Sequence, residues 1–226
     1  MHILNEYCDN IFVITVERFG RKNKVMERMA GIDFRFFDGV DGSLVSDEVY
    51  NTYLNNRLEG SHKLSRGMYG CSSSHLNLYK KIYEERLDNV LILEDDVSVS
   101  SNTDNLGGYF DQLSDYELVY FGMNNGNKRY DNLLKPNKSD NVMELTPEMV
   151  RRNPLYTIEG TNAYFIRNNG FVKELIDFQS RWMFTADGAL IEYLKQYDKT
   201  YHVLLPQVLP SDDNNESIII KIDNDK

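Results

Sequence analysis

The chain has 226 residues, of which 41% are hydrophobic and 12% aromatic, and its formal net charge is −10. This length and composition predict a globular protein that buries a core of its own, in one large domain or a small pair. The negative charge disfavours nucleic acid as a main partner, because phosphate binding needs a basic surface. A local basic pocket for a phosphorylated small molecule is still compatible with it.

Cysteine use and hydropathy indicate the compartment. Two cysteines, Cys8 and Cys71, are too few for a disulfide framework, which predicts a reducing environment. The first ten residues lack a basic segment followed by a long apolar one, so we expect no signal peptide. No stretch approaches the roughly 18 apolar residues that span a bilayer. We therefore expect a cytoplasmic protein and leave peripheral association with a membrane open.

Short apolar runs alternate with helical patterns along the first part of the chain. Residues 11–14 predict a first strand, 22–29 a helix, and 34–37 a second strand. Residues 43–63 are mostly polar, and a short helix with a loop fits them. This alternation is typical of an α/β fold.

The stretch 64–97 combines a glycine-bearing turn, a helix and a strand. Either Ser72 or Ser73 can cap the start of the helix by accepting a backbone hydrogen bond. Residues 90–93 are apolar and β-branched, which predicts a strand buried on both faces. The predicted apolar stripe of the helix consists of Leu76, Tyr79, Tyr83 and Leu87.

Three carboxylates, Glu94, Asp95 and Asp96, follow this strand directly. Ligands of open α/β sheets bind at the carboxyl ends of strands, so chemistry is expected here. Glu94 and Asp96 would point to the same side if the strand geometry persists. Two oxygen ligands side by side suit a Mg²⁺ or Mn²⁺ that also binds phosphate oxygens. The alternative is a polar turn in which an aspartate accepts backbone hydrogen bonds.

The second half continues the pattern. Residues 98–114 predict a loop with one short helix, and 117–122 predict another buried strand. Residues 123–140 are rich in Asn and Lys, so we expect a mobile loop, either a lid over an acceptor or a disordered insertion. Further strands are predicted at 160–166 and 201–206.

Two helices are predicted between these last strands, at about 170–178 and around 190–194. The second would leave Asp187 near its amino end, where the helix dipole favours a carboxylate. Capping that helix is the simpler role for Asp187.

The segment 67–76, GMYGCSSSHL, followed by a lysine-rich helix and the run 91–97, LILEDDV, resembles the central signature of glycosyltransferase family 25. This family includes lipooligosaccharide galactosyltransferases and collagen hydroxylysine galactosyltransferases. A looser resemblance extends from about Ile11 to Gln207.

The resemblance implies a glycosyltransferase A-type fold with a mixed, mostly parallel sheet, in a single domain over residues 1–226. A nucleotide-sugar-binding part would cover about 10–122 and an acceptor-side part about 155–210. The implied reaction moves a hexose, for which we expect galactose, from a UDP-sugar to a hydroxyl group, with inversion. The acceptor would be a glycan, a lipooligosaccharide or a hydroxylysine.

In this interpretation Glu94 and Asp96 hold Mn²⁺ or Mg²⁺, and Asp95 contacts the donor sugar or ribose. Arg18 follows the first strand and would bind the diphosphate through charge-assisted hydrogen bonds. For Arg21, that role and a solvated helix start are equally open.

Asp41 would bind the ribose or uracil of the donor, or form only an Asx-turn. Gly70, inside the signature, is assigned to donor binding. Gly160 and Thr161 begin a motif that resembles the family's G-T-x-G-Y-x-I, and they are assigned to acceptor binding.

Asp187 lies in a segment that matches the family's P-V-D-x-x-L, and we expect it to act as the base that deprotonates the acceptor hydroxyl. His75 is interpreted as a packed structural residue, with donation to a carboxylate or phosphate as the alternative. Cys71 is expected to be a small buried hydrophobe.

Two other functions fit parts of the pattern. Clustered carboxylates also build the two-metal sites of phosphoryl-transfer enzymes and nucleases, although such sites need more acidic ligands. The nonenzymatic alternative is a degenerate relative that binds a sugar nucleotide or glycan as a scaffold. Met68, which stands where the family has glutamate, favours the scaffold, whereas Asp187 and the intact triplet 94–96 disfavour it.

Overall fold

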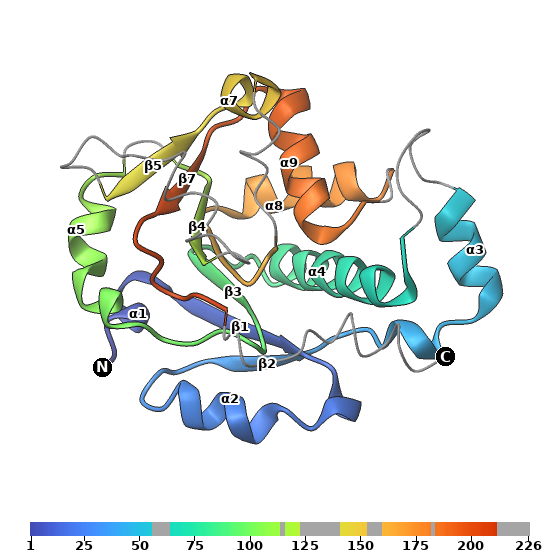
Figure 1. Ribbon diagram of the computed structural model, residues 1–226, viewed down its shortest axis with the longest axis horizontal. Helices are drawn as coiled ribbons and strands as arrows, with labels where there is room; N and C mark the ends of the chain where they lie inside the picture. The colour runs from blue at the N-terminus through green and yellow to red at the C-terminus, as the bar shows by residue number, and fades with distance from the viewer. Residues whose placement is uncertain (56–63, 114–115, 123–140, 153–159, 182–183, 212–226) are drawn as a thin grey trace.

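The computed structural model describes residues 1–55, 64–113, 116–122, 141–152, 160–181 and 184–211. These residues form a seven-stranded sheet in the order β2-β1-β3-β6-β4-β7-β5 (Figure 1). The strands are β1 (Asn10–Thr15), β2 (Arg35–Asp38), β3 (Val90–Glu94), β4 (Leu118–Gly122), β5 (Val142–Leu145), β6 (Ala163–Ile166) and β7 (Tyr201–Leu204).

The sheet is mixed. Pairing is parallel between β1 and β2, β1 and β3, and β4 and β7. It is antiparallel where β6 meets β3 and β4 and where β5 meets β7. Only β5 and β6 therefore run against the other strands of the described sheet, so the predicted α/β fold around a mixed, mostly parallel sheet is confirmed. The reversed direction of β6 brings its amino end to the carboxyl end of β3.

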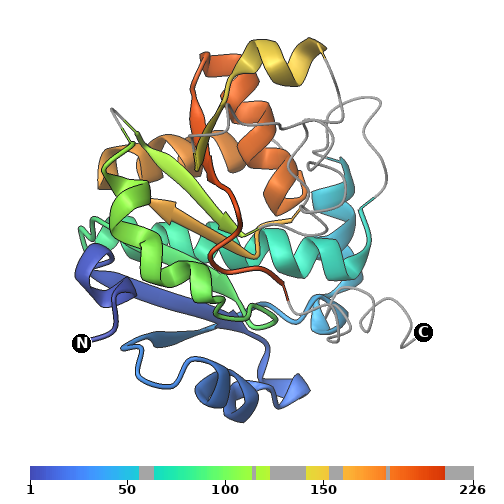
Figure 2. The same cartoon turned by 60° about the vertical axis from the view of Figure 1, so that its left-hand side comes forward.

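Helices cover both faces of the sheet. In Figures 1 and 2, α4, α8 and α9 lie together on one face, and α1 and α5 lie on the other. Each face has its own hydrophobic core, because successive residues of a strand point to opposite sides. The described α-helices are α1 (Leu4–Tyr7), α2 (Lys22–Arg28), α3 (Asp47–Asn55), α4 (Arg66–Glu84), α5 (Leu106–Phe110), α7 (Pro147–Arg152), α8 (Asn169–Gln179) and α9 (Ala186–Tyr197).

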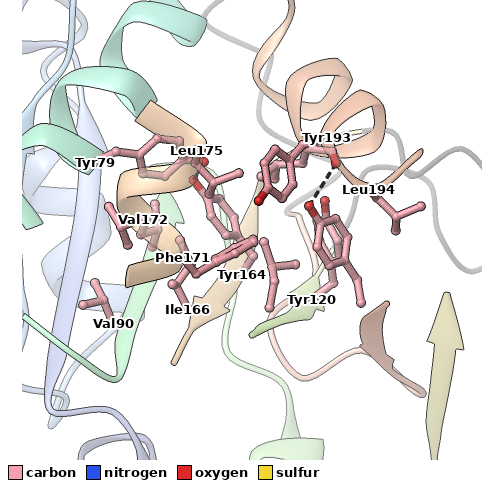
Figure 3. Packing of buried hydrophobic residues seen from close by; sticks show 14 of the residues in the cluster. Tyr79, Val90, Tyr120, Tyr164, Ile166, Phe171, Val172, Leu175, Tyr193 and Leu194 are labelled. Carbon is pink, nitrogen blue, oxygen red and sulfur yellow. Dashed lines mark hydrogen bonds between the residues drawn. The ribbon is translucent and has the colours of Figure 1, made fainter. Parts of the chain in front are cut away.

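The core on the α4 side is rich in aromatic residues (Figure 3). Tyr79 of α4, Tyr164 of β6 and Tyr193 of α9 are all buried there. Buried tyrosine hydroxyls need hydrogen-bond partners, and those of Tyr79 and Tyr164 lie 2.7 Å apart. This core therefore contains a polar contact beneath the carboxyl end of β3.

Helix α4 begins earlier than the sequence predicts. Ser65 is its N-cap and accepts a backbone hydrogen bond from the first turn at 3.1 Å, so the prediction that Ser72 or Ser73 caps the helix is wrong. The predicted apolar stripe is also wrong in part, because Tyr83 is 40% exposed. The buried residues in the second half of the helix are Ser74, His75, Leu78, Tyr79 and Ile82.

Two glycines explain this early start. A Cβ atom at Gly70 would lie 2.6 Å from the carbonyl oxygen of Val40, and one at Gly42 would lie 1.8 Å from the carbonyl oxygen of Arg66. The loop around Gly42 therefore packs backbone to backbone against the first turns of α4. Glycine is a poor helix former, which favoured a turn at this point of the sequence, but here it permits close packing.

The other elements compare closely with the prediction. Strands β1, β2, β4, β6 and β7 and helices α2 and α8 are confirmed within a few residues. Strand β5 and helices α1 and α7 were not predicted. The expected loop at 123–140 lies outside the described residues. None of the helices in the described part of the chain is long and apolar enough to cross a membrane.

Candidate active site

The reversed strand β6 builds the site together with β3. Leu93 of β3 pairs with Ala163 of β6, and the backbone N–H of Glu94 donates to the carbonyl of Asn162 at 2.8 Å. The residues just before β6 thus lie beside the acidic end of β3. Thr161 and Asn162, although distant in sequence, become direct partners of the carboxylates.

Glu94 is held as an ionised carboxylate. Its Oε1 accepts a hydrogen bond from Thr161 Oγ1 at 2.6 Å and lies 3.4 Å from His75 Nε2. Burial opposes ionisation, but the contacts with His75 and Thr161 outweigh it, so the pKa of Glu94 lies below its ordinary value. Glu94 therefore carries a negative charge on a side chain that is 25% exposed.

Asp96 lies next to this charge. Its Oδ1 accepts a hydrogen bond from Asn162 Nδ2 at 3.2 Å. Burial, followed by the charge of Glu94, raises the pKa of Asp96 to about 7. Two nearby carboxylates repel each other unless a cation lies between them. The metal-binding role of Glu94 and Asp96 stays a prediction.

The pair fits a divalent cation with oxygen ligands. Asn162 is fully buried, and its Oδ1 has no hydrogen-bond partner among the described residues. Its Nδ2 is already bonded to Asp96. A buried amide oxygen without a partner, next to two carboxylates, is a donor set that Mn²⁺ or Mg²⁺ accepts.

Asp95 faces a different environment. It is 3% exposed, and its two carboxyl oxygens accept hydrogen bonds from Thr15 Oγ1 at 3.0 Å and Arg21 Nη1 at 2.9 Å. Arg28 donates to its backbone carbonyl. Burial still raises the pKa of Asp95, against the opposing effects of Arg21 and Thr15. Of the two arginines weighed for the donor, Arg21 is therefore the one that contacts the acidic triplet.

Arg18 and Asp41 form an ion pair with 3.0 Å between Arg18 Nε and Asp41 Oδ2. The side chain of Arg18 is 40% exposed. Asp41 also accepts hydrogen bonds from the backbone and hydroxyl of Ser43, at 3.0 and 2.6 Å, which is the Asx-turn alternative. Gly70 packs against the neighbouring loop. The donor-binding roles of Arg18, Asp41 and Gly70 stay predictions.

Asp187 ties α9 to the loop before β6. Its Oδ2 accepts a hydrogen bond from Gly160 N at 3.0 Å, and its Oδ1 accepts one from Gly188 N at 2.8 Å. The N-cap of α9 is Thr185, which accepts from Gly188 N at 3.1 Å, so Thr185 takes the capping role that was the alternative for Asp187. Asp187 instead fixes the backbone next to Thr161.

Cys71 was not predicted to belong to the site, and contact with a carboxylate was only the alternative role for His75. Both lie on α4, four residues apart and therefore on one face. The ligand atoms of Cys71, His75 and Glu94 lie within 4.8 Å of one another. Burial, and then the charges of Glu94, Asp187 and Asp96, raise the pKa of the Cys71 thiol well above its ordinary range. The i, i+4 spacing was the available sequence signal.

The fixed orientation of His75 supports this cluster. Its ring is 1% exposed, and Nδ1 lies 2.7 Å from the hydroxyl of Tyr164, which also contacts Tyr79. Nε2 consequently faces Glu94 and Thr161, at 3.4 and 3.3 Å. The structural role expected for His75 is present, and so is its alternative contact with a carboxylate.

Comparison with known proteins adds three relatives. The lipooligosaccharide biosynthesis protein lic2B of Haemophilus influenzae is 26% identical over 148 residues, which cover 62% of this chain and 55% of that protein. Procollagen galactosyltransferase 2 of Homo sapiens is 27% identical over 128 residues, covering 50% of this chain and 20% of that one. A Bos taurus protein named probable inactive glycosyltransferase 25 family member 3 is 26% identical over 199 residues, covering 80% of this chain and 31% of that one.

The chain spans about a fifth of the length of the insect glycosyltransferase 25 family members that it also matches. The profile that describes glycosyltransferase family 25 (LPS biosynthesis protein) matches residues 8–190, which include all the site residues described above. The chain therefore belongs to glycosyltransferase family 25.

Proposed function

We propose that this protein transfers a hexose, in the first place galactose, from a UDP-sugar to a hydroxyl group with inversion at the anomeric carbon. The acceptor would be a glycan, a lipooligosaccharide or a hydroxylysine. Family membership and the names of two relatives support this proposal. The observation that carries it is the placement of Glu94 and Asp96 at the end of β3, bonded by Thr161 and Asn162, where burial and then the charge of Glu94 raise the pKa of Asp96 to about 7.

Glu94 and Asp96 would hold Mn²⁺ or Mg²⁺, with the free amide oxygen of Asn162 as a further ligand. A divalent cation there would offset the negative charge that develops on the departing uridine diphosphate. Thr161 and His75 keep Glu94 ionised and fix its position, so the pair is preorganised before the substrate arrives.

Asp187 would remove the proton of the acceptor hydroxyl as that oxygen attacks the anomeric carbon and the bond to the diphosphate breaks. Its contacts with Gly160 and Gly188 leave lone pairs on both carboxyl oxygens. Gly160 and Thr161 would position the acceptor, since the first is bonded to Asp187 and the second to Glu94.

Arg18, in the short 3-10 helix Glu17–Phe19 that follows β1, is exposed enough to reach the diphosphate of a bound donor. Asp41 and Gly70 would shape the donor side, and Asp95 would contact the sugar or ribose after a rearrangement of its present bonds. In this assignment residues 10–122 bind the donor and 155–210 serve the acceptor, within a single domain.

A catalytically degenerate scaffold is the second candidate. One relative that matches most of this chain is named probable inactive, and Met68 replaces a glutamate of the family signature. The scaffold would bind a sugar nucleotide without turnover. The described carboxylates favour the enzyme.

The deciding experiment measures release of uridine diphosphate from a panel of UDP-sugars, with an acceptor mixture of glycans and hydroxylysine peptides, first with Mn²⁺ and then with chelator. We expect release from one sugar, lost with chelator and in Asp96→Ala. Binding of uridine diphosphate with Mn²⁺, seen as a higher melting temperature without turnover on any pair, would support the scaffold. Turnover that is insensitive to chelator and to Asp96→Ala would contradict the metal assignment.

A further inference from the structure

We propose that Cys71, His75 and Glu94 form a second cation site, suited to Zn²⁺ or another borderline divalent ion. It shares Glu94 with the proposed site of Glu94, Asp96 and Asn162, called here the oxygen-ligand site. The site itself rests on the side chains described. Its consequence, inhibition of transfer by zinc, rests on the proposed function.

The geometry brings three different ligand types together. Cys71 and His75 project from one face of α4, and Glu94 comes from the end of β3. Their ligand atoms lie within 4.8 Å of one another, and Nε2 of His75 is already 3.4 Å from Oε1 of Glu94. Ligands on one zinc ion lie about 2.0 to 2.3 Å from it, so side-chain shifts of about 1 Å complete the set. Three protein ligands leave a fourth position open.

His75 already has the outer hydrogen bond that metal-binding histidines use. The hydroxyl of Tyr164 lies 2.7 Å from Nδ1, which leaves Nε2 for the cation. Cation binding at Nε2 requires the ring proton on Nδ1, from which it donates to Tyr164. The hydroxyls of Tyr164 and Tyr79 can reverse their hydrogen bond to allow this, because either can be the donor.

The thiol of Cys71 decides which metal the cluster prefers. On binding, the S–H bond breaks, a sulfur–metal bond forms, and the proton passes to water. Burial, and then the nearby carboxylates, disfavour a free thiolate, and a divalent cation bound to the sulfur offsets these effects. Thiolate and imidazole ligands suit Zn²⁺ and Co²⁺, whereas Mg²⁺ and Mn²⁺ prefer oxygen. Zn²⁺ would thus occupy this cluster and draw Glu94 away from the oxygen-ligand site.

Co²⁺ is the probe for the full-length chain, because a thiolate bound to Co²⁺ gives a near-ultraviolet charge-transfer absorption. We expect this absorption in the parent and in Cys8→Ser, which removes the other cysteine, and its loss in Cys71→Ser. Tyr164→Phe should weaken Co²⁺ binding about tenfold or more, since it removes the outer hydrogen bond of His75. Absorption that persists in Cys71→Ser, or is absent from the folded parent, would overturn the proposal.

A second measurement needs no variant. Zn²⁺ should slow alkylation of partly buried Cys71 in the parent by about tenfold or more, and Mg²⁺ at the same concentration should not. Equal protection by both ions, or by neither, would contradict the site. If Co²⁺ and Zn²⁺ behave as expected but no UDP-sugar is turned over, the proposed function fails while the cation site stands.

Discussion

The two sides of the acidic triplet differ in how their charge is balanced. Asp95 meets Thr15 and Arg21, which bond both of its oxygens. Glu94 and Asp96 meet hydroxyl, amide and imidazole groups, and the thiol of Cys71 lies beside Glu94. Carboxylates at adjacent positions therefore have different partners: Asp95 anchors β3 to the arginine-bearing segment, whereas Thr161 and Asn162 bond Glu94 and Asp96.

The largest expected effect tests the proposed role of Asp187 as the base. Asp187→Asn should lower kcat by about 10² to 10⁴-fold, because the amide cannot take the acceptor proton but still accepts from Gly160. Asp177→Asn, on the exposed face of α8, is the control and should leave kcat unchanged. The assay is steady-state release of uridine diphosphate. Turnover within a few-fold of the parent, with the fold intact, would remove Asp187 from the role of base.

The next effect tests the ion pair between Arg21 and Asp95. Arg21→Ala leaves buried Asp95 without its cation and should lower the free energy of unfolding by about 3 to 5 kcal/mol, measured by urea denaturation. Arg18→Ala breaks a more exposed ion pair with Asp41 and should cost about 1 kcal/mol or less. Equal losses of free energy of unfolding for Arg21→Ala and Arg18→Ala would show that Arg21 does not stabilise buried Asp95 in particular.

Binding of Mn²⁺ should stabilise the protein only through Glu94 and Asp96. Mn²⁺ at about 100 times its dissociation constant would add about 2.7 kcal/mol to the free energy of unfolding. Glu94→Gln should abolish this gain, whereas Glu85→Gln, on the exposed end of α4, should keep it. Thermal denaturation with and without Mn²⁺ provides the comparison. If Mn²⁺ stabilised Glu94→Gln as much as the parent, the metal would bind elsewhere than at Glu94.

The smallest effect concerns pH in the absence of divalent cations. The folded-state pKa of Asp96, about 7, exceeds its unfolded value of about 3.9, so ionising Asp96 destabilises the fold. The penalty is absent below about pH 4, grows as the pH rises, and is complete above about pH 7.

Asp96→Asn should therefore raise the free energy of unfolding by at least about 1 kcal/mol at pH 8 in chelator and by little at pH 4. Chemical denaturation of parent and variant at both pH values measures the difference. A variant that is less stable than the parent at pH 8 would show that ionised Asp96 does not destabilise the folded state.

Local sequence patterns were enough to predict β3 and the acidic triplet. A short β-branched run followed by carboxylates carries its own signal, and the alternation of strands and helices predicted the α/β class. The start of α4 was misplaced because glycine has poor helix propensity, and the close packing that Gly70 permits involves a loop elsewhere in the sequence. Helix propensity depends on the local residues and contains no information about a packing partner that is remote in sequence.

The partners of the carboxylates depend on long-range topology. Asn162 and Thr161 reach β3 because β6 inserts between β3 and β4 in the reversed direction, which no local pattern encodes. The preference for Arg18 over Arg21 failed to anticipate that Arg21 contacts Asp95, because direction of approach decides that contact. The roles of both arginines toward a donor stay predictions.

The contact between Gly42 and the first turn of α4 has a consequence for how this protein can diverge. A side chain at position 42 would strike the carbonyl of Arg66, and one at 70 would strike that of Val40. The loop that carries Asp41 and Gly42 and the helix that carries Cys71 and His75 are therefore closely coupled. Sequence drift can alter the exposed residues around them, but it must leave these two backbones in contact.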